Sequence, residues 1–237
     1  MTIDLRIIAV AVLAACKGAQ DARAKTPAPS AENAAAAATP SATSTPTAAT
    51  SNDPLVARAD SSRIRGSASA KVWLILASDF QCPYCKMWHD STDAVIRREY
   101  VDNGKVRLAF VNFPLNIHPN AIPAAEYAMC AAAQDKFWQM HDSLFAQQEK
   151  WAPQENPTAA LEQVAVSAGV DLTALRSCVS AHKMRPLIEA DHEKAARAGV
   201  RATPSFFIGN QVLEGVQPAS ELRKALDAAL AGAGAQK

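Results

Sequence analysis

The stretch KVWLILASDFQCPYC, residues 71–85, contains the features that decide the fold. Residues 71–77 form a continuous apolar run with β-branched and aromatic side chains, which predicts a strand buried on both faces. The sequence after this run has a helical pattern that continues to about Tyr100. Residues 105–113 then alternate well enough for a second strand. Strand, helix and strand in this order predict a βαβ unit, with parallel strands and a right-handed crossover.

Residues 120–200 have a different character. They are rich in Ala, Gln and Glu, and their apolar residues recur at helical spacing. The segment is divided at Pro153, Pro157, Gly169 and Gly199. We expect four or so helices, whose apolar and aromatic residues pack together rather than bind a cofactor.

The chain returns to strand character after this helical block. Residues 205–208 and 211–214 flank a turn at Gly209-Asn210, which predicts a hairpin, and a last helix is expected from Pro218 to about Leu230. A βαβ start, a helical insertion at about 120–200 and a ββα finish predict an α/β fold with an inserted helical subdomain. We expect this domain over residues 60–232, followed by a short tail at 233–237.

Two cysteines lie where the first strand gives way to the helix. Cys82 and Cys85 are separated by two residues, a spacing that allows a disulfide between them. The first turn of a helix offers unpaired N–H groups and the positive end of the helix dipole, and both stabilise a thiolate. We therefore predict that Cys82, at the exposed helix start, attacks a substrate disulfide, and that Cys85, one turn inward, resolves the mixed disulfide.

The same cysteine spacing also occurs in zinc sites. His89 lies four residues after Cys85 and would add a third ligand on the same helix face. Zinc usually takes four ligands, and neither a second cysteine pair nor a pair of histidines supplies the rest. We therefore favour redox chemistry, predict no metal, and interpret His89 as an ordinary helix-surface residue.

A proline stands immediately before the third predicted strand. Thr203-Pro204 lies about 120 residues after the cysteine pair. Proline at the first residue of a strand cannot donate to the ladder, and an X-Pro bond is the one that readily becomes cis. A trans proline at the entry to the strand is the alternative interpretation of these residues.

The segments SDFQCPYC, NFPLNIHPNA, KFWQMHDSLF and GVRATPSFFIGN occur in this order, and together they resemble bacterial DsbA-like thiol-disulfide oxidoreductases of the thioredoxin superfamily. The resemblance covers roughly residues 60–232 and implies a thioredoxin fold interrupted by a helical domain. It also implies that Pro204 is a cis-proline facing the active-site disulfide. Thr203 would then offer backbone groups to an extended substrate peptide.

The sequence departs from this family at one position. Many members have an acidic residue six positions before the first active-site cysteine, thought to help move protons at the buried cysteine, and here that position is Leu76. Asp79 is the nearest alternative, but its place just before the loop suggests a local capping group rather than a buried acid. We therefore expect proton transfer to Cys85 to rely on water or to be slower.

Cys130 and Cys178 both lie in the helical block. Two buried free thiols would suit a reducing compartment, whereas an exported protein favours a disulfide. We predict a structural disulfide between Cys130 and Cys178. Some members of the resembled family also have a second, non-catalytic disulfide in this region.

The N-terminal residues predict export. Residues 1–15 contain Arg6 and an apolar run too short to span a bilayer, as in a signal peptide. The ending Leu-Ala-Ala-Cys16 resembles a bacterial lipobox, which implies a diacylglycerol on the sulfur of Cys16; an ordinary signal with a chance cysteine is the alternative. Residues 16–59 are expected to be a disordered linker, because all but two residues of 26–51 are Ala, Thr, Pro or Ser.

These features predict a thiol-disulfide oxidoreductase on the periplasmic side of the bacterial cell envelope, lipid-anchored to a membrane, or secreted or periplasmic without the anchor. Its partners would be exported proteins with thiols or disulfides and a membrane redox protein that recycles the active site. The balance of 24 Lys and Arg against 23 Asp and Glu argues against nucleic-acid binding. Without a recognisable dimerisation module, we expect a monomer that donates disulfides. The alternatives are a reductase or isomerase, or a chaperone that holds a soft metal at Cys82 and Cys85.

Overall fold

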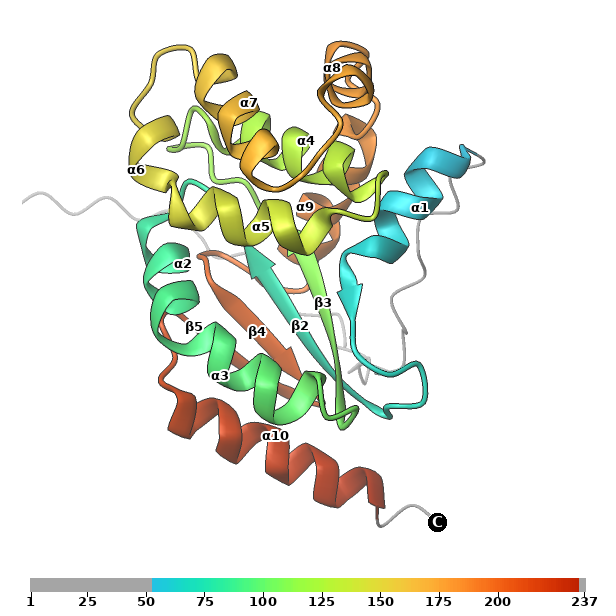
Figure 1. Ribbon diagram of the computed structural model, residues 1–237. Helices are drawn as coiled ribbons and strands as arrows, with labels where there is room; N and C mark the ends of the chain where they lie inside the picture. Colours follow the sequence, from blue (N-terminus) through green and yellow to red (C-terminus); the bar gives the residue numbers. More distant parts are fainter. Residues whose placement is uncertain (1–52, 235–237) are drawn as a thin grey trace, which may run out of the picture. The chain divides into compact units, whose positions relative to one another are not determined.

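The computed structural model describes residues 53–234. Within them, the apolar run predicted as the first strand forms β2 (Val72–Ser78), the central strand of a sheet with the order β1-β3-β2-β4-β5 (Figure 1). The predicted signal peptide, Cys16, the linker as far as residue 52 and the tail residues 235–237 lie outside the described residues.

The neighbours of β2 define the topology. On one side β3 (Val106–Asn112) pairs with it in parallel, as the predicted βαβ unit requires. On the other side β4 (Ser205–Ile208) pairs with it antiparallel, and β5 (Gln211–Glu214) continues the sheet as a hairpin. Because β4 runs against β2, the residues that precede β4 lie beside those that follow β2.

The crossover between β2 and β3 is one continuous helical segment. It consists of α2 (Pro83–Trp88), the π-helical turn η1 (His89–Asp93), α3 (Ala94–Ile96) and the π-helical turn η2 (Arg97–Val101). Proline is tolerated at the first helical position because the N–H that it lacks has no partner there in any case. Because Pro83 is the first residue of α2, Cys82 is its N-cap and lies at the start of the helix.

The helical insertion contains more helices than the four or so predicted. Within the described residues it comprises α4 (Ala121–Ala132), α5 (Phe137–Ala146), α6 (Gln148–Trp151), α7 (Thr158–Ser167), α8 (Leu172–Ser180) and α9 (Arg185–Arg197). Two of the additional breaks occur beside Asp135 and His182, which adopt positive φ angles of 59° and 48°. Neither break contains the Gly or Pro that usually signals a helix end, so the sequence pattern missed them.

The folded part also extends further at both ends than predicted. A helix, α1 (Pro54–Ser62), and a short strand, β1 (Ile64–Arg65), precede β2, so the expected domain start at residue 60 falls inside α1. The helix forms because Asp53 caps it and because Val56 and Ala59 are buried where α1 packs against α4. At the other end α10 (Ala219–Gly234) continues into the expected tail.

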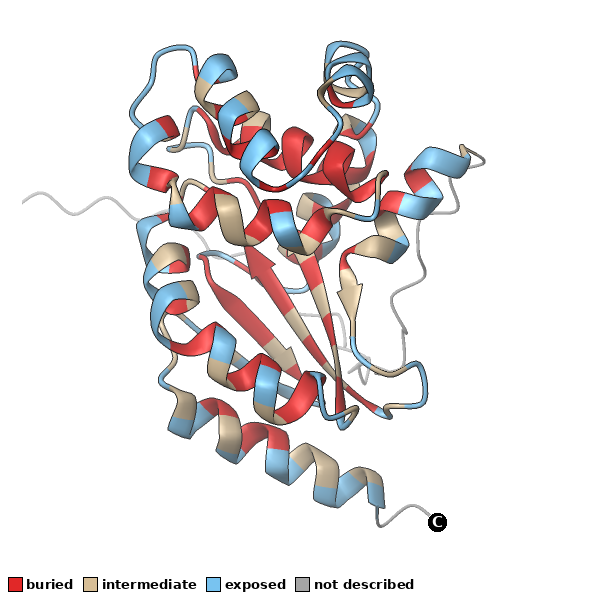
Figure 2. Cartoon of the chain, in the orientation of Figure 1, coloured by how far each residue is buried: buried red, intermediate tan, exposed pale blue. Residues whose placement is uncertain are grey.

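Helices cover both faces of the sheet. α10 packs against α3, β2 and β4, and α9 packs against β3 (Figure 1). The side chains under α9 form a separate apolar cluster that includes Ala77, Phe113, Ala195 and Val200. Figure 2 shows buried residues along β2, α4 and α5, whereas α8 is largely exposed. Within residues 53–234, the structure contains no helix with the length and apolar character needed to cross a membrane.

Candidate active site

Cys82 and Cys85 lie at the start of α2, just after the end of β2. Cys82 is the N-cap residue, and its N–H donates to the Asp79 carbonyl at 3.1 Å, which closes the turn between strand and helix. Both cysteines are unpaired thiols. Cys85 is 1% exposed, as expected for the inner cysteine, but Cys82 is only 3% exposed. The prediction of an exposed Cys82 is therefore wrong, although the neighbouring Tyr84 is 59% exposed.

The segment that precedes β4 covers Cys82. The Thr203–Pro204 peptide bond is cis, and both residues are buried. The Cys82 thiol donates a hydrogen bond to the Thr203 carbonyl, with 3.5 Å between sulfur and oxygen. These residues are 121 positions apart in sequence, and the antiparallel pairing of β4 with β2 brings them together. The structure therefore places all four predicted active-site residues in one location.

The two thiols ionise very differently. A hydrogen bond from the Cys85 thiol, helped by the backbone amides of Tyr84 and Cys85, lowers the pKa of Cys82 from its ordinary value of 9.0 to about 6, against the opposing effect of burial. Burial raises the pKa of Cys85 well above 9.0, and the neighbouring Cys82 raises it further. The pair therefore favours a thiolate on Cys82 and a neutral thiol on Cys85.

The acidic group nearest in sequence to the cysteine pair, Asp79, is buried. Its oxygens accept hydrogen bonds from the N–H groups of Gln81 at 2.7 Å and Leu115 at 2.9 Å, and His118 Nδ1 lies at 2.6 Å. Burial raises the pKa of Asp79, and these hydrogen bonds oppose that shift. The expectation of a local cap rather than a buried acid is thus only half correct, because Asp79 is both. Leu76 is 1% exposed.

His89 is not a surface residue, contrary to the sequence interpretation. Its side chain is 14% exposed, and its ring packs against Phe145 with centroids 5.0 Å apart. Its Nδ1 lies 3.0 Å from Asp90 and its Nε2 lies 3.3 Å from Asp142. Both ring nitrogens therefore contact carboxylates. His89 does not join Cys82 and Cys85 in the zinc site that their spacing had suggested as an alternative.

His89 instead belongs to a polar cluster between η1 and α5. Donor atoms of His89, Asp93, His141 and Asp142 lie within 4.8 Å of one another, a combination that could hold a metal ion. The guanidinium of Arg97, however, contacts Asp93 at 2.7 Å and Asp142 at 3.0 Å. One cation of the protein itself thus bridges the two carboxylates, and the cluster connects the helical segment after Cys85 to α5 of the insertion.

Cys130 and Cys178 form a disulfide that joins α4 to α8. Their Cα atoms are 5.8 Å apart, although 48 positions separate them in sequence. This bond is the predicted pairing, and it leaves Cys82 and Cys85 as the free thiols of the described residues.

The insertion also contacts the active-site loop through side-chain amides that the sequence analysis missed. Gln148, the first residue of α6, donates to the carbonyls of Phe80 and Cys82. Gln81 and Asn120 form a second connection, from the Asn120 N–H to Gln81 Oε1 at 2.6 Å. Asn120 lies in one of the segments that carried the family resemblance, and Gln148 closely follows another. Only the folded chain shows that they meet the cysteine loop.

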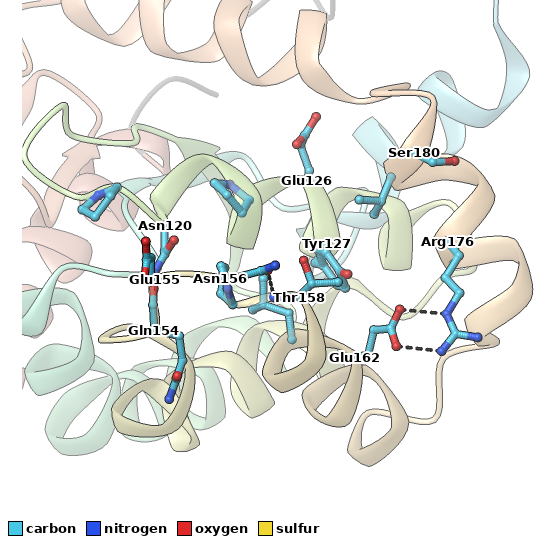
Figure 3. A pocket seen from close by; sticks show the side chains of 15 residues that line it. Asn120, Glu126, Tyr127, Gln154, Glu155, Asn156, Thr158, Glu162, Arg176 and Ser180 are labelled. Atoms are coloured by element: carbon cyan, nitrogen blue, oxygen red, sulfur yellow. Dashed lines mark hydrogen bonds and ion pairs between the residues drawn. The ribbon is translucent and has the colours of Figure 1, made fainter.

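A cleft of about 950 Å³ opens in the insertion beside this connection (Figure 3). α4, α7, α8 and the loop before α7 line it, and Asn120 forms part of its wall. At its far end Glu162 and Arg176 form a two-pronged ion pair, with both oxygen–nitrogen distances at 2.7 Å (Figure 3). The cleft therefore has both polar and apolar walls and lies within the helical insertion.

The chain is similar in sequence to known proteins over most of its length. The thioredoxin family model described as "Thioredoxin" matches residues 58–228. The chain is 33% identical to Na(+)/H(+) antiporter NhaA 3 of Salinispora tropica over 73% of its own length, but it spans only 26% of that protein. It is 25% identical to a protein named "Probable disulfide bond formation protein D" of Bacillus anthracis, over 68% of this chain and 75% of that protein.

Solved structures show the same fold. BdbD from Bacillus subtilis superposes with a TM-score of 0.64 at 22% identity, over 71% of this chain and 92% of that one. The alpha-DsbA1 protein of Wolbachia pipientis gives a TM-score of 0.64 at 22% identity, over 72% and 92%. Its fold, with a helical insertion between β3 and β4, is similar to those of these two solved structures. Because the family model matches most of its length, this chain belongs to the thioredoxin family.

Proposed function

We propose that this protein is a thiol-disulfide oxidoreductase in which Cys82 is the nucleophile and Cys85 is the resolving thiol. One observation carries the proposal: two cysteines at the start of one helix have opposite pKa shifts, to about 6 for Cys82 and well above 9.0 for Cys85. A lowered thiol pKa at a helix start is typical of cysteines that exchange disulfides.

The proposed reaction transfers two electrons from a substrate dithiol to the protein. A substrate thiolate attacks Cys82 Sγ of the Cys82–Cys85 disulfide, the sulfur–sulfur bond breaks, and Cys85 leaves and takes up a proton. The second substrate thiolate then attacks the substrate sulfur of the mixed disulfide. Cys82 leaves as a thiolate, the substrate is oxidised to a disulfide, and the protein is left with two reduced cysteines.

The direction of exchange that we propose is disulfide donation. Cys82 is the leaving group when the substrate disulfide forms, and a thiol with a low pKa leaves faster. A stabilised thiolate also favours the reduced protein over its disulfide form, so the disulfide form is oxidising. A reductase would need a disulfide form that is more stable than its reduced form.

Thr203 and Pro204 are the proposed contact for the substrate peptide. The Thr203 carbonyl already lies 3.5 Å from Cys82 Sγ, so a peptide that reaches the sulfur must pass beside this segment. An extended chain gains affinity by pairing its backbone with exposed backbone groups. Pro204 has no N–H, so this contact would be made by the Thr203 backbone.

We further propose that the protein acts in the bacterial cell envelope as a monomer anchored by lipid on Cys16. Its partners would be exported proteins and a membrane redox protein that reoxidises the cysteine pair. The support is the signal-like sequence of residues 1–15 and the lipobox-like ending before Cys16. Growth with radiolabelled fatty acid should label the wild type and leave Cys16→Ser unlabelled; an unlabelled wild type would contradict the anchor.

Oxidative refolding tests the main proposal. The oxidised protein is mixed with a reduced, unfolded model substrate, and disulfides in the substrate and thiols in the protein are counted over time. We expect one substrate disulfide to form for each Cys82–Cys85 disulfide lost, and no transfer by Cys82→Ser. Cys85→Ser cannot form the active-site disulfide, so it is mixed instead with a substrate that already contains disulfides, where attack by Cys82 should leave trapped mixed disulfides. Wild-type protein that binds the substrate but transfers no disulfide would refute the proposal.

A further inference from the structure

The side chain of Gln148 connects the helical insertion to the backbone around the nucleophile. Its Nε2 lies 2.7 Å from the Phe80 carbonyl oxygen and 3.1 Å from the Cys82 carbonyl oxygen. Gln148 is only 6% exposed, so water has little access to these contacts. A primary amide has two N–H donors, and here two carbonyls on either side of Gln81 accept them.

Gln81, the residue between Phe80 and Cys82, is also held by the helical insertion. Gln81 Oε1 accepts from the Asn120 N–H at 2.6 Å, and Gln81 Nε2 donates to the Ala152 carbonyl at 2.9 Å. The insertion therefore contacts three consecutive residues that end at Cys82. In contrast, the Cys82 sulfur itself faces Thr203, which precedes β4.

This arrangement acts on Cys82 in two ways. The oxygen end of a carbonyl carries partial negative charge, which disfavours a nearby thiolate, and the Gln148 N–H groups offset that charge for Phe80 and Cys82. The same contacts also fix the backbone of Cys82, whose sulfur must stay within reach of the Cys85 thiol and the amides at the helix start. Loss of the donors removes both effects.

We propose that Gln148 is a positioning residue through which the helical insertion sets the reactivity of Cys82. The proposal rests on the exchange function given above, and it assigns the insertion a part in the chemistry. Gln148 hydrogen-bonds to the carbonyls of Phe80 and Cys82, so it acts through the backbone of residues 80–82.

The test replaces Gln148 with methionine, which has a similar length and volume but no N–H donor. The matched control is Gln147→Met, because Gln147 is the preceding residue and its Oε1 contacts Lys150 Nζ at the surface, at 3.4 Å. Two quantities are measured in each reduced protein: the pH dependence of iodoacetamide alkylation, mapped to the Cys82 peptide by mass spectrometry, and the equilibrium constant for exchange with glutathione.

We expect Gln148→Met to raise the alkylation midpoint of Cys82 by about one pH unit, which corresponds to about a tenfold smaller ratio of thiolate to thiol below the midpoint. The glutathione equilibrium should move toward the Cys82–Cys85 disulfide by a similar factor, and Gln147→Met should match the wild type. An unchanged midpoint and equilibrium in folded Gln148→Met would overturn the proposal. An equal shift in Gln147→Met would overturn it as well.

Should Gln148→Met not fold, Gln148→Leu provides the same test, because its side chain is uncharged and donates no hydrogen bond. A wild-type midpoint in that variant would again overturn the proposal. Failure of the exchange function would be seen differently, as a wild-type protein that does not react with glutathione or substrate. The alkylation midpoint would still report on Gln148 in that case.

Discussion

Removal of the Cys130–Cys178 disulfide should destabilise the protein markedly. The bond closes a loop of 48 positions, and in the chain-entropy model such a loop contributes about 4 kcal/mol at 25 °C. The structure gives a reason to expect most of that value. α8 buries only Leu175, so few apolar contacts would hold this helix against α4 after the bond is lost.

The perturbation is Cys130→Ala with Cys178→Ala, made in a Cys82→Ala, Cys85→Ala background so that active-site redox state does not vary. For a domain of this size each kcal/mol lowers the melting temperature by about 2–4 °C, so about 4 kcal/mol corresponds to a loss of about 8–16 °C. Circular dichroism during thermal and urea unfolding measures both quantities. The matched control is the background protein treated with a reductant, which should lose the same amount.

A loss below about 1 kcal/mol would refute this reasoning, because the loop would then contribute little to the free energy of unfolding. Hydrogen exchange separates the remaining possibilities. If amides of α8 alone lose protection while the melting temperature is unchanged, the disulfide stabilises one helix rather than the whole domain, and the chain-entropy magnitude does not apply.

The remaining predictions concern the active site. Because the pKa of Cys82 is lowered from 9.0 to about 6 in the folded reduced protein, its thiolate stabilises that form fully above pH 9.0, and this contribution is lost as pH falls through about 6. Titration of the reduction potential should accordingly steepen from about 30 mV per pH unit above that point to about 59 mV below it, and a single slope would contradict the pKa. Leu76→Glu should change the pH dependence of exchange at Cys85 and destabilise the core by about 3 kcal/mol; stopped-flow kinetics that match the wild type would count against a role for that position. Asp79→Asn should lower the free energy of urea unfolding by about 1–3 kcal/mol, since the new amide cannot accept every hydrogen bond that the carboxylate accepts, and an unchanged unfolding midpoint would show that these bonds are not needed.

Local pattern was sufficient for the elements that build the sheet. The apolar run at 71–77 became β2, the alternating run at 105–113 became β3, and the hairpin strands formed at the predicted residues. Strands of this kind are predictable because burial of one or both faces requires a fixed side-chain pattern along the chain. The α1 helix was missed because its apolar residues are few, and contact with α4, far away in sequence, buries them.

The sequence by itself located the cysteine pair and indicated redox chemistry, because two cysteines at this spacing can form a disulfide, although the same spacing also occurs in zinc sites. Only the tertiary structure decided how that pair is controlled. Cys82 is covered by Thr203, and Gln148 reaches its backbone from the insertion. His89 joins a partly buried polar cluster, although its helix position suggested the surface. Burial and hydrogen bonding depend on segments more than fifty residues away, and no local pattern along the chain records which of them will meet.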